Sequence, residues 1–341
     1  MKSFASDNYA GVLPEVMEAL QKANQEHAVS YGNDALTQRV RKLFKEVFAA
    51  DVTVLFVFNG TGANVLSISG ATNTFNSVLC ADSSHIYNDE SSAPETITGC
   101  RFFPIPANKE GKLEPAALEQ KIIRKGDIHF AQPKVISVTQ ATEYGTVYTP
   151  EHLREIGQLA RKHELYFHMD GSRLFNAAAS LNCSLKEITT DVGLDILSLG
   201  GTKLGMMFGE AVVVFNPRLA EHIYYKQKQV MQLASKTRFI AAQYEALLTN
   251  DLWREPAAHA NAMALKLRDV LSAVKDIKVT MPVDANAVFA IIPREWLQPL
   301  QQAFPFYVWN ESTTEVRLMC SFDTTEKDIE AFAKVLKQLA S

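Results

Sequence analysis

The chain has 341 residues, of which 47% are hydrophobic and 21% are charged. This composition is that of an ordinary globular protein, and the length suits roughly two domains of about 150 residues each. It excludes a collagen-like, coiled-coil or wholly disordered chain. The net charge of -4 provides no positive field that would attract nucleic acid, so we expect no nucleic-acid partner.

The first 14 residues carry one lysine and then polar residues, where a signal peptide needs a continuous apolar stretch. No segment approaches the roughly 18 consecutive apolar residues of a membrane span. We therefore expect a cytoplasmic protein without membrane contact. Four scattered cysteines and eight histidines form no C-x-x-C, H-E-x-x-H or zinc-type cluster, so we expect free thiols and no metal site.

Short apolar segments rich in Val, Ile and Phe alternate with longer amphipathic segments, which is typical of an α/β domain with buried strands. Helices are expected between most of these strands, and two of the helices, at 14–23 and 150–163, begin with Pro. Thr149 is the expected N-cap of the second helix. The six predicted strands are residues 52–58, 77–81, 135–139, 165–169, 196–199 and 211–215.

Helical sequence is predicted from about Leu219 through Arg238 to Leu248, after which the pattern changes. Three more strands (278–280, 288–292 and 316–319) and a closing helix (326–339) are expected in this last part. We expect a large α/β domain whose mostly parallel central sheet has helices on both faces, and a smaller α+β C-terminal domain. The predicted boundaries are an N-terminal segment at 1–20, the large domain at 21–248 and the small domain at 249–341.

A glycine-rich turn, NGTGAN, follows the first predicted strand at Asn59. In doubly wound sheets the ligand site lies beyond the carboxyl ends of the strands. A turn of this kind points free backbone N–H groups at an anion, which suits a phosphate group, although a purely structural turn fits the sequence equally well. The turn is neither a Walker A motif nor a G-x-G-x-x-G fingerprint.

Asp170 and Lys203 follow two further predicted strands. Asp170, with Arg173 after it, could form a partly solvated ion pair or could keep the ring nitrogen of pyridoxal phosphate protonated. A lone lysine such as Lys203 lies on the surface more often than it acts as a nucleophile. A phosphate turn, an aspartate and a lysine at successive strand ends nevertheless form a combination that chance explains poorly, and partial burial would favour the neutral amine that a nucleophilic lysine needs.

The motifs NGTGAN, HIYNDE, DGSR and GGTKLG together resemble the low-specificity L-threonine aldolases, which have the aspartate-aminotransferase-like fold (fold type I). The segments FASDNYAGVLPEVMEAL, YGNDALT, TQATEYGTVY and FGEAVVVF resemble the same family, so the likeness extends from Phe4 to about Ile329. It implies cleavage of threonine and related β-hydroxy amino acids to glycine and an aldehyde, with pyridoxal 5'-phosphate as cofactor. It also implies a homo-oligomer, a dimer of dimers with sites at the subunit interface.

The resemblance further implies roles for individual residues. Lys203 would bind the cofactor covalently and Asp170 would bind its ring nitrogen. His85 would stack on the ring and His129 would contact the substrate hydroxyl, and either histidine could be the catalytic base. The other expected contacts are Gly60, Thr61, Arg173 and Thr202 to the cofactor; Ser6, Arg173 and Arg317 to the substrate carboxylate; Lys228 and Arg238 to a neighbour's phosphate; and Tyr31 reaching across to the substrate.

Three residues depart from the family's pattern: Ser172, Leu204 and Ser92. None of them removes an expected catalytic group, but Leu204 borders Lys203 and could alter the substrate range. Other enzymes of the same fold, such as a β-eliminating lyase or an aminotransferase, would share Lys203 and Asp170 and break a different bond. A nicotinamide-dependent dehydrogenase would need G-x-G-x-x-G after the first strand, and a non-enzyme would lack one of the expected groups.

Overall fold

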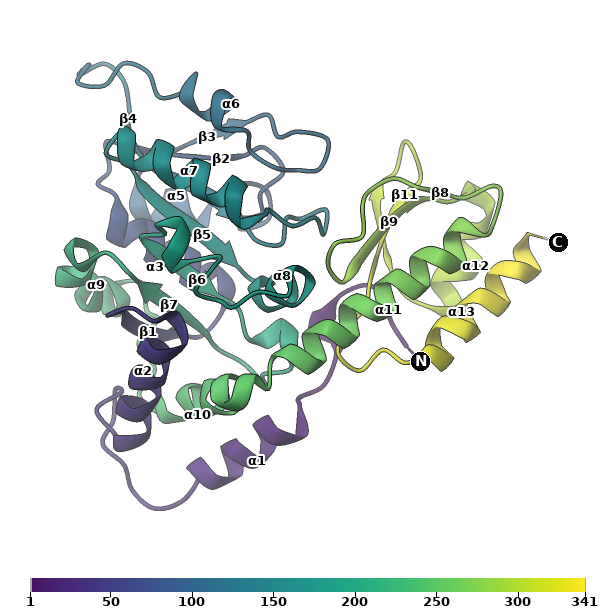
Figure 1. The fold of residues 1–341 in the computed structure, drawn as a ribbon, viewed down its shortest axis with the longest axis horizontal. Coiled ribbons are helices and arrows are strands. Elements are labelled where there is room, and N and C mark those ends of the chain that lie inside the picture. The colour runs from purple at the N-terminus through teal and green to yellow at the C-terminus, as the bar shows by residue number, and fades with distance from the viewer. Residues whose placement is uncertain (1, 341) are drawn as a thin grey trace.

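The computed structural model describes residues 2–340, which form two sheets with helices around them (Figure 1). The large sheet has the strand order β1-β7-β6-β5-β4-β2-β3, and the small sheet has the order β10-β11-β9-β8. The strands of the large sheet are β1 (Thr53–Val57), β2 (Asn76–Ala81), β3 (Arg101–Ile105), β4 (Gln132–Thr139), β5 (Tyr166–Gly171), β6 (Ile196–Leu199) and β7 (Glu210–Val214). Those of the small sheet are β8 (Lys278–Val279), β9 (Ala287–Ile291), β10 (Tyr307–Asn310) and β11 (Glu315–Met319).

Helices precede, separate and follow these strands. The α-helices are α1 (Pro14–Ala23), α2 (Ala35–Phe48), α3 (Gly60–Ala71), α4 (His85–Asn88), α5 (Ala93–Thr98), α6 (Pro115–Glu119), α7 (Pro150–Lys162), α8 (Leu174–Leu181), α9 (Pro217–Gln229), α10 (Arg238–Leu248), α11 (Arg254–Ser272), α12 (Arg294–Ala303) and α13 (Glu326–Leu339). Four short 3₁₀ turns are η1 (Asp7–Tyr9), η2 (Thr190–Val192), η3 (Thr202–Leu204) and η4 (Thr249–Asp251). None of the helices within residues 2–340 is long and apolar enough to cross a membrane.

The strand directions bring the ends of six strands to one edge of the large sheet. Strands β3, β2, β4, β5 and β6 are parallel neighbours, whereas β7 runs antiparallel to both β6 and β1. Strand β1 therefore has the same direction as β6. The segments that follow β1, β2, β3, β4, β5 and β6 consequently lie at the carboxyl edge, where ligand sites of such sheets lie.

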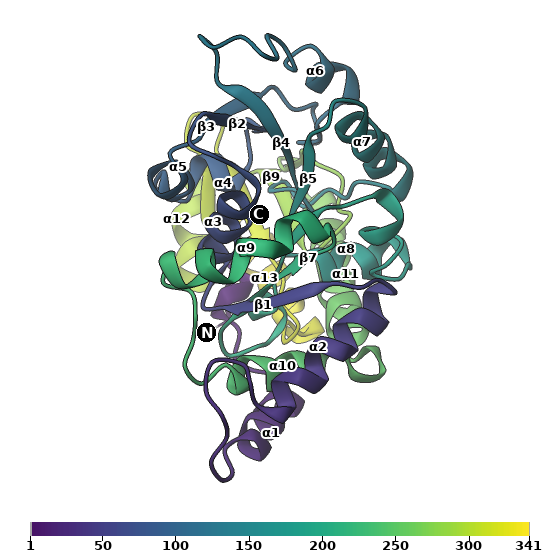
Figure 2. The ribbon, with the colours of Figure 1, turned by 90° about the vertical axis from the view of Figure 1, so that its left-hand side faces the viewer.

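Alternate side chains of each strand pack on opposite faces of the large sheet, as the period of two requires. In β1, Leu55 and Val57 belong to a core formed with α3 and α9, and Val54 and Phe56 belong to one formed with α2, α7, α8 and α10. Figure 2 shows these two groups of helices on either side of the sheet. The predicted fold class, a mostly parallel sheet with helices on both faces and a smaller α+β part, is confirmed.

The N-terminal segment packs with the C-terminal part of the chain before it reaches the large sheet. Phe4 is fully buried in the core of the small sheet, and its backbone bonds to Pro305 and Met319. Helix α11 connects the two cores, because Ala257 lies in the core of the large sheet and Met263 in that of the small sheet (Figure 1). The boundaries at 20/21 and 248/249 remain predictions.

Most predicted elements agree with the structure to within a few residues, and α1, α13 and β6 agree throughout. The single helical region predicted to run from Leu219 to Leu248 is wrong, because α9 ends at Gln229 and α10 begins only at Arg238. Between them the backbone turns, with Met231 at a φ of 61°. Strands β3 and β10 were not predicted.

Gly157, inside α7, provides a test of the packing beneath the large sheet. A Cβ atom at this position would lie 2.1 Å from the backbone oxygen of Val192, which cannot rotate away. We expect Gly157→Ala to destabilise the fold by about 2 kcal/mol or more, although alanine ordinarily stabilises a helix interior. Urea unfolding would measure this, with Gln158→Ala on the exposed face as control. A Gly157→Ala protein as stable as the parent would contradict the packing.

Candidate active site

Two polar cavities meet at Lys203, beyond the carboxyl edge of the large sheet. The larger has a volume of about 270 Å³ and the smaller about 120 Å³. The residues that line both are Asn8, His85, Asp170, Ser172 and Lys203. Three strand ends and the N-terminal segment thus contribute to a single site, as the positions of Asp170 and Lys203 after their strands predicted.

The N-terminus of α3 forms one wall of the larger cavity. Asn59 caps the helix, and its side-chain oxygen accepts the N–H of Gly62 at 2.7 Å. The N–H groups of Gly60 and Thr61 begin the helix and have no acceptor within residues 2–340, because the first N–H groups of a helix lack intrahelical partners. This end of the cavity is suited to an anion.

Asp170 lies at the floor of the larger cavity, at the end of β5. One carboxylate oxygen accepts the Ser172 hydroxyl at 2.6 Å and its N–H at 3.0 Å, and the other accepts the Asn64 amide at 2.9 Å. Burial raises the pKa of Asp170, but these hydrogen bonds and the charge of Lys203 outweigh burial and hold the pKa below its ordinary value. Asp170 is therefore a buried carboxylate that can bind a protonated nitrogen.

Lys203 follows β6 in the turn η3 and lines both cavities. Burial and the nearby guanidinium of Arg173 lower the pKa of Lys203, which favours the neutral amine. Behind it, Glu210 on β7 accepts the N–H of Gly201 at 2.5 Å, and burial raises the pKa of Glu210 to about 7. Thr202 lines the larger cavity beside them. An amine in this setting can attack a carbonyl group.

His85 begins α4, after β2, and its ring borders both cavities. Its Nδ1 lies 2.9 Å from Glu90 Oε1, and this hydrogen bond raises the pKa of His85. Its backbone N–H donates to Glu143 Oε1 at 2.6 Å. The structure therefore places His85 in the site, with its ring held on one side by a buried carboxylate.

Arg173 and Asp7 form a buried ion pair at the smaller cavity. Arg173 donates from Nε to Asp7 at 2.8 Å and from Nη2 at 3.0 Å, so that both carboxylate oxygens are engaged. Asn286 donates to the same carboxylate at 3.1 Å. Burial raises the pKa of Asp7, but the adjacent Arg173 more than compensates and lowers it. Nη1 of Arg173 is left for a ligand.

Arg317, on β11, faces the smaller cavity from the small sheet. Its guanidinium carbon lies 5.1 Å from the ring centre of Trp309 and 5.7 Å from that of Tyr307. Its Nε is buried and has no hydrogen-bond partner among the described residues. Ser6 lines the same cavity. A carboxylate bound here would satisfy the unpaired donor.

Four of the predicted site residues do not line either polar cavity in this chain. His129 is exposed in the loop before β4, where Asp127 accepts its N–H at 2.9 Å. Lys228 stacks over the exposed Tyr31, 5.4 Å from the ring centre. Arg238 donates to the carbonyl of Glu26 at 3.5 Å. Contacts of these four residues with a ligand remain predictions.

Several residues of the site were not predicted. Asn64, Glu90, Glu143 and Asp7 lie within the very segments that carry the resemblance, but nothing in their spacing distinguishes them. Trp309 comes from β10, which was itself missed. A signal for Glu143 was nevertheless present, because an acidic residue in an otherwise uncharged segment that follows a buried strand is a candidate ligand-facing group.

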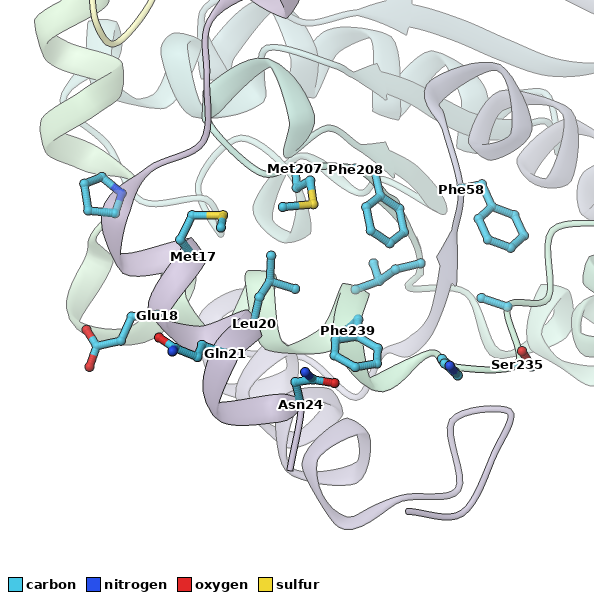
Figure 3. Close-up of a pocket in the computed structure, with 14 residues that line it drawn as sticks. Met17, Glu18, Leu20, Gln21, Asn24, Phe58, Met207, Phe208, Ser235 and Phe239 are labelled. Carbon is cyan, nitrogen blue, oxygen red and sulfur yellow. The ribbon is translucent and has the colours of Figure 1, made fainter. Parts of the chain in front are cut away.

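An apolar pocket of about 1020 Å³ adjoins the larger polar cavity and shares Phe58 and Phe208 with it. Figure 3 shows Met17 and Leu20 of α1, Met207, and Phe239 of α10 around it. Met17 is 46% exposed and Met207 is 45% exposed. The site thus lies beside an exposed apolar surface.

Comparisons with known proteins agree with this arrangement. The model of the beta-eliminating lyase family matches residues 3–294. The low specificity L-threonine aldolase of Pseudomonas sp. (strain NCIMB 10558) is 39% identical over 100% of this chain and 98% of its own. The protein of the same name from Pseudomonas aeruginosa is 38% identical over 98% of this chain and 97% of its own.

The structural comparison extends over the same length. A solved structure of Leishmania major threonine aldolase superposes with a TM-score of 0.94 at 30% identity, and the match covers 100% of both chains. The identity of 38–39% to the two Pseudomonas proteins over nearly the full length shows membership of their family as well as a shared fold. The chain therefore belongs to the beta-eliminating lyase family, and within it to the low-specificity L-threonine aldolases.

Proposed function

We propose that this chain is a pyridoxal-phosphate-dependent lyase that cleaves L-threonine and L-allo-threonine to glycine and acetaldehyde. The observation that carries the proposal is the position of Lys203, whose amine has a lowered pKa and lies where the two polar cavities meet. One cavity suits an anionic aromatic cofactor and the other suits an amino-acid carboxylate. The names of the relatives support the same activity.

The residues of the larger cavity fit pyridoxal phosphate by charge. The free N–H groups of Gly60 and Thr61 would bind the phosphate, and ionised Asp170 would keep the ring nitrogen protonated. Asn64 and Glu90 line this cavity, and Asn64 Oδ1 and Glu90 Oε2 are buried acceptors without hydrogen-bond partners among the described residues. When bound, the cofactor supplies an electron sink for a bond broken at the α-carbon of an amino acid.

The smaller cavity would orient the substrate. Arg317, Nη1 of Arg173 and Ser6 would bind the α-carboxylate, with its amine at Lys203. Holding both groups fixes the direction of the bond between Cα and Cβ, and this direction decides which bond breaks. His85 would cover the face of the cofactor ring.

Other reactions use the same machinery and are separated by their products. A β-eliminating lyase or an aminotransferase would also use Lys203 and Asp170 but would form a keto acid from its substrate. The ligand atoms of His85, Glu90 and Asp170 lie within 4.8 Å of one another, close enough for a metal ion. We propose no metal, because Asp170 accepts hydrogen bonds from Ser172 and Asn64 on both oxygens.

We also propose that the protein is a cytoplasmic homo-oligomer, a dimer of dimers. The exposed apolar pocket between α1 and α10 supports a subunit contact next to the cofactor cavity. Lys228, Arg238 and Tyr31 lie outside the two polar cavities that meet at Lys203 of their own chain, which is compatible with roles at a neighbour's site. A second copy would then complete each site.

Lys203→Ala tests the covalent attachment of the cofactor. Wild-type protein incubated with pyridoxal phosphate and then borohydride should carry one cofactor per chain on the peptide that contains Lys203. The variant should carry none there, because Lys203 is the only lysine among the described residues that line the larger cavity. Mass spectrometry of the digested protein measures this, with exposed Lys162→Ala as the matched control. Labelling that persists at another site in place of Lys203 would refute the assignment.

Arg317→Gln tests the carboxylate site. A charge-assisted hydrogen bond is worth about 1.5 to 3 kcal/mol, so KM for threonine should rise about 10- to 100-fold. Arg317→Lys should recover part of this loss, since lysine restores the positive charge but not the two parallel donors of the guanidinium group. Cofactor content should stay at the wild-type level, as Arg317 does not line the larger cavity. Unchanged KM in the glutamine variant would place the carboxylate elsewhere.

Met17→Glu tests the subunit contact. Burying a new carboxylate in an apolar interface is costly, so the variant should sediment as a smaller species than the wild type. Glu15→Gln, an exposed position on the same helix that does not line the pocket, should keep the wild-type mass. If Met17→Glu sediments like the wild type, the contact lies on another surface.

A further inference from the structure

Glu143 lies after the end of β4 and lines the smaller polar cavity. Its Oε1 is fixed by two donors, the N–H of His85 at 2.6 Å and the hydroxyl of Thr139 at 2.9 Å. Its Oε2 has no hydrogen-bond partner within residues 2–340, and this oxygen is accessible to solvent. One oxygen is therefore held in place while the other is available to a molecule in the cavity.

Apart from Asp89, the remaining ionisable groups of this cavity already have tasks or partners. Asp170 accepts three donors, and the ring of His85 is bonded to Glu90. Asp89 is exposed. Arg173 and Arg317 are suited to the carboxylate of an amino acid, and Lys203 is the group at which its amine would lie. The titratable groups that line the cavity around Glu143 are His85, Asp89, Asp170, Arg173, Lys203 and Arg317.

The electrostatic setting of Glu143 makes its carboxylate a stronger proton acceptor than an exposed one. Burial raises the pKa of Glu143 and the negative charge of Asp170 raises it further, whereas the N–H of His85 and the hydroxyl of Thr139 lower it, and the net shift is upward. A base whose pKa approaches the working pH transfers protons most effectively. The ring of His85, by contrast, is already engaged through Nδ1, which lies 2.9 Å from Glu90 Oε1.

We propose that Glu143 takes the proton from the β-hydroxyl group of the substrate. The proposal rests on the proposed aldolase function and names the residue that acts at Cβ. The substrate amine would lie at Lys203, and its carboxylate at Arg317 and Arg173. The third substituent of Cα, Cβ with its hydroxyl group, would then face the part of the cavity wall that Glu143 lines. Glu143 Oε2 is the uncommitted acceptor on that wall.

The step balances without any further reactant. Oε2 accepts the hydroxyl proton, the C–O bond becomes the C=O bond of the aldehyde, and the Cα–Cβ bond breaks. Its electron pair stays with the fragment that becomes glycine. Glu143 then releases the proton to water and the α-carbon takes one proton from water, so the net reaction neither consumes nor releases a proton.

Glu143→Gln in the cofactor-loaded enzyme tests the proposal. Threonine cleavage should lose at least about 100-fold in kcat, the usual contribution of a general base. Exchange of the α-proton of glycine with solvent needs no β-hydroxyl group and should stay within about threefold of the wild-type rate. Exposed Glu155→Gln, on α7, is the matched control and should leave both rates unchanged. A parallel loss of both reactions, or retention of cleavage, would overturn the assignment.

The cofactor-free protein provides a readout that does not depend on activity. A carboxyl group whose pKa is higher in the folded than in the unfolded chain stabilises the fold below the unfolded pKa and loses that contribution as the pH rises. Wild-type protein should therefore lose stability relative to Glu143→Gln as the pH rises from about 4.5 through the folded pKa. Parallel unfolding curves over this range would show that Glu143 does not titrate as proposed.

Thr139→Val is a second variant that keeps the carboxyl group. Loss of the hydroxyl donor should raise the pKa of Glu143, so the acid limb of the kcat/KM profile for threonine should move to higher pH. An unmoved limb would contradict the role of Glu143. If instead the wild type releases no acetaldehyde from threonine at any pH, the proposed function fails, and the unfolding experiment still reports on Glu143.

Discussion

The buried ion pair between Arg173 and Asp7 joins the three parts of the chain that form the site. Arg173 follows β5 of the large sheet, Asp7 belongs to the N-terminal segment, and Asn286, which also donates to Asp7, precedes β9 of the small sheet. A buried pair is costly to desolvate and costly to break, because either partner alone would be an unpaired charge in the interior. The pair therefore fixes where the small sheet sits against the carboxyl edge.

The carboxyl groups around the site differ in what opposes the effect of burial. For Asp7 the charge of Arg173, and for Asp170 the hydrogen bonds from Ser172 and Asn64 together with the charge of Lys203, outweigh burial, and their pKa values fall. For Glu210 and Glu143 burial dominates over their hydrogen bonds, and their pKa values rise. The same cavity edge thus holds carboxylates that stay ionised beside carboxyl groups that can exchange protons, which is the division of roles that acid–base chemistry requires.

The sequence allowed the core of this site to be predicted because its main residues follow buried strands. Val-rich and Ile-rich segments identified five of the strands whose ends meet; Gly60, His85 and Lys203 follow three of them, and Asp170 lies at the end of a fourth. Strand β3 was missed because Pro104 interrupts an edge strand, where the lost N–H donor is tolerated. Strand β10 is a short edge strand with a register shift.

Other parts of the site depend on contacts between distant segments. Arg173 and Asp7 are 166 residues apart, and no local pattern indicates that they pair. The resemblance assigned the guanidinium of Arg173 to the substrate carboxylate, but two of its nitrogens, Nε and Nη2, donate to Asp7. For His129 the resemblance supplied a role, but local hydrogen bonding to Asp127 keeps the residue in an exposed loop of its own chain.

The substrate end of the site is shared between the two sheets, and this division separates binding from chemistry. Lys203, Asp170 and Glu143 are anchored to strand ends of the large sheet, whereas Arg317 and Trp309 come from the small sheet. The reacting groups therefore have a rigid frame of their own. The position of the carboxylate depends on how the small sheet docks, which the contacts of Asp7 to Arg173 and Asn286 fix. A change at this contact should alter both the substrate orientation and the pKa of Lys203, because Arg173 lowers that pKa and Asp7 raises it.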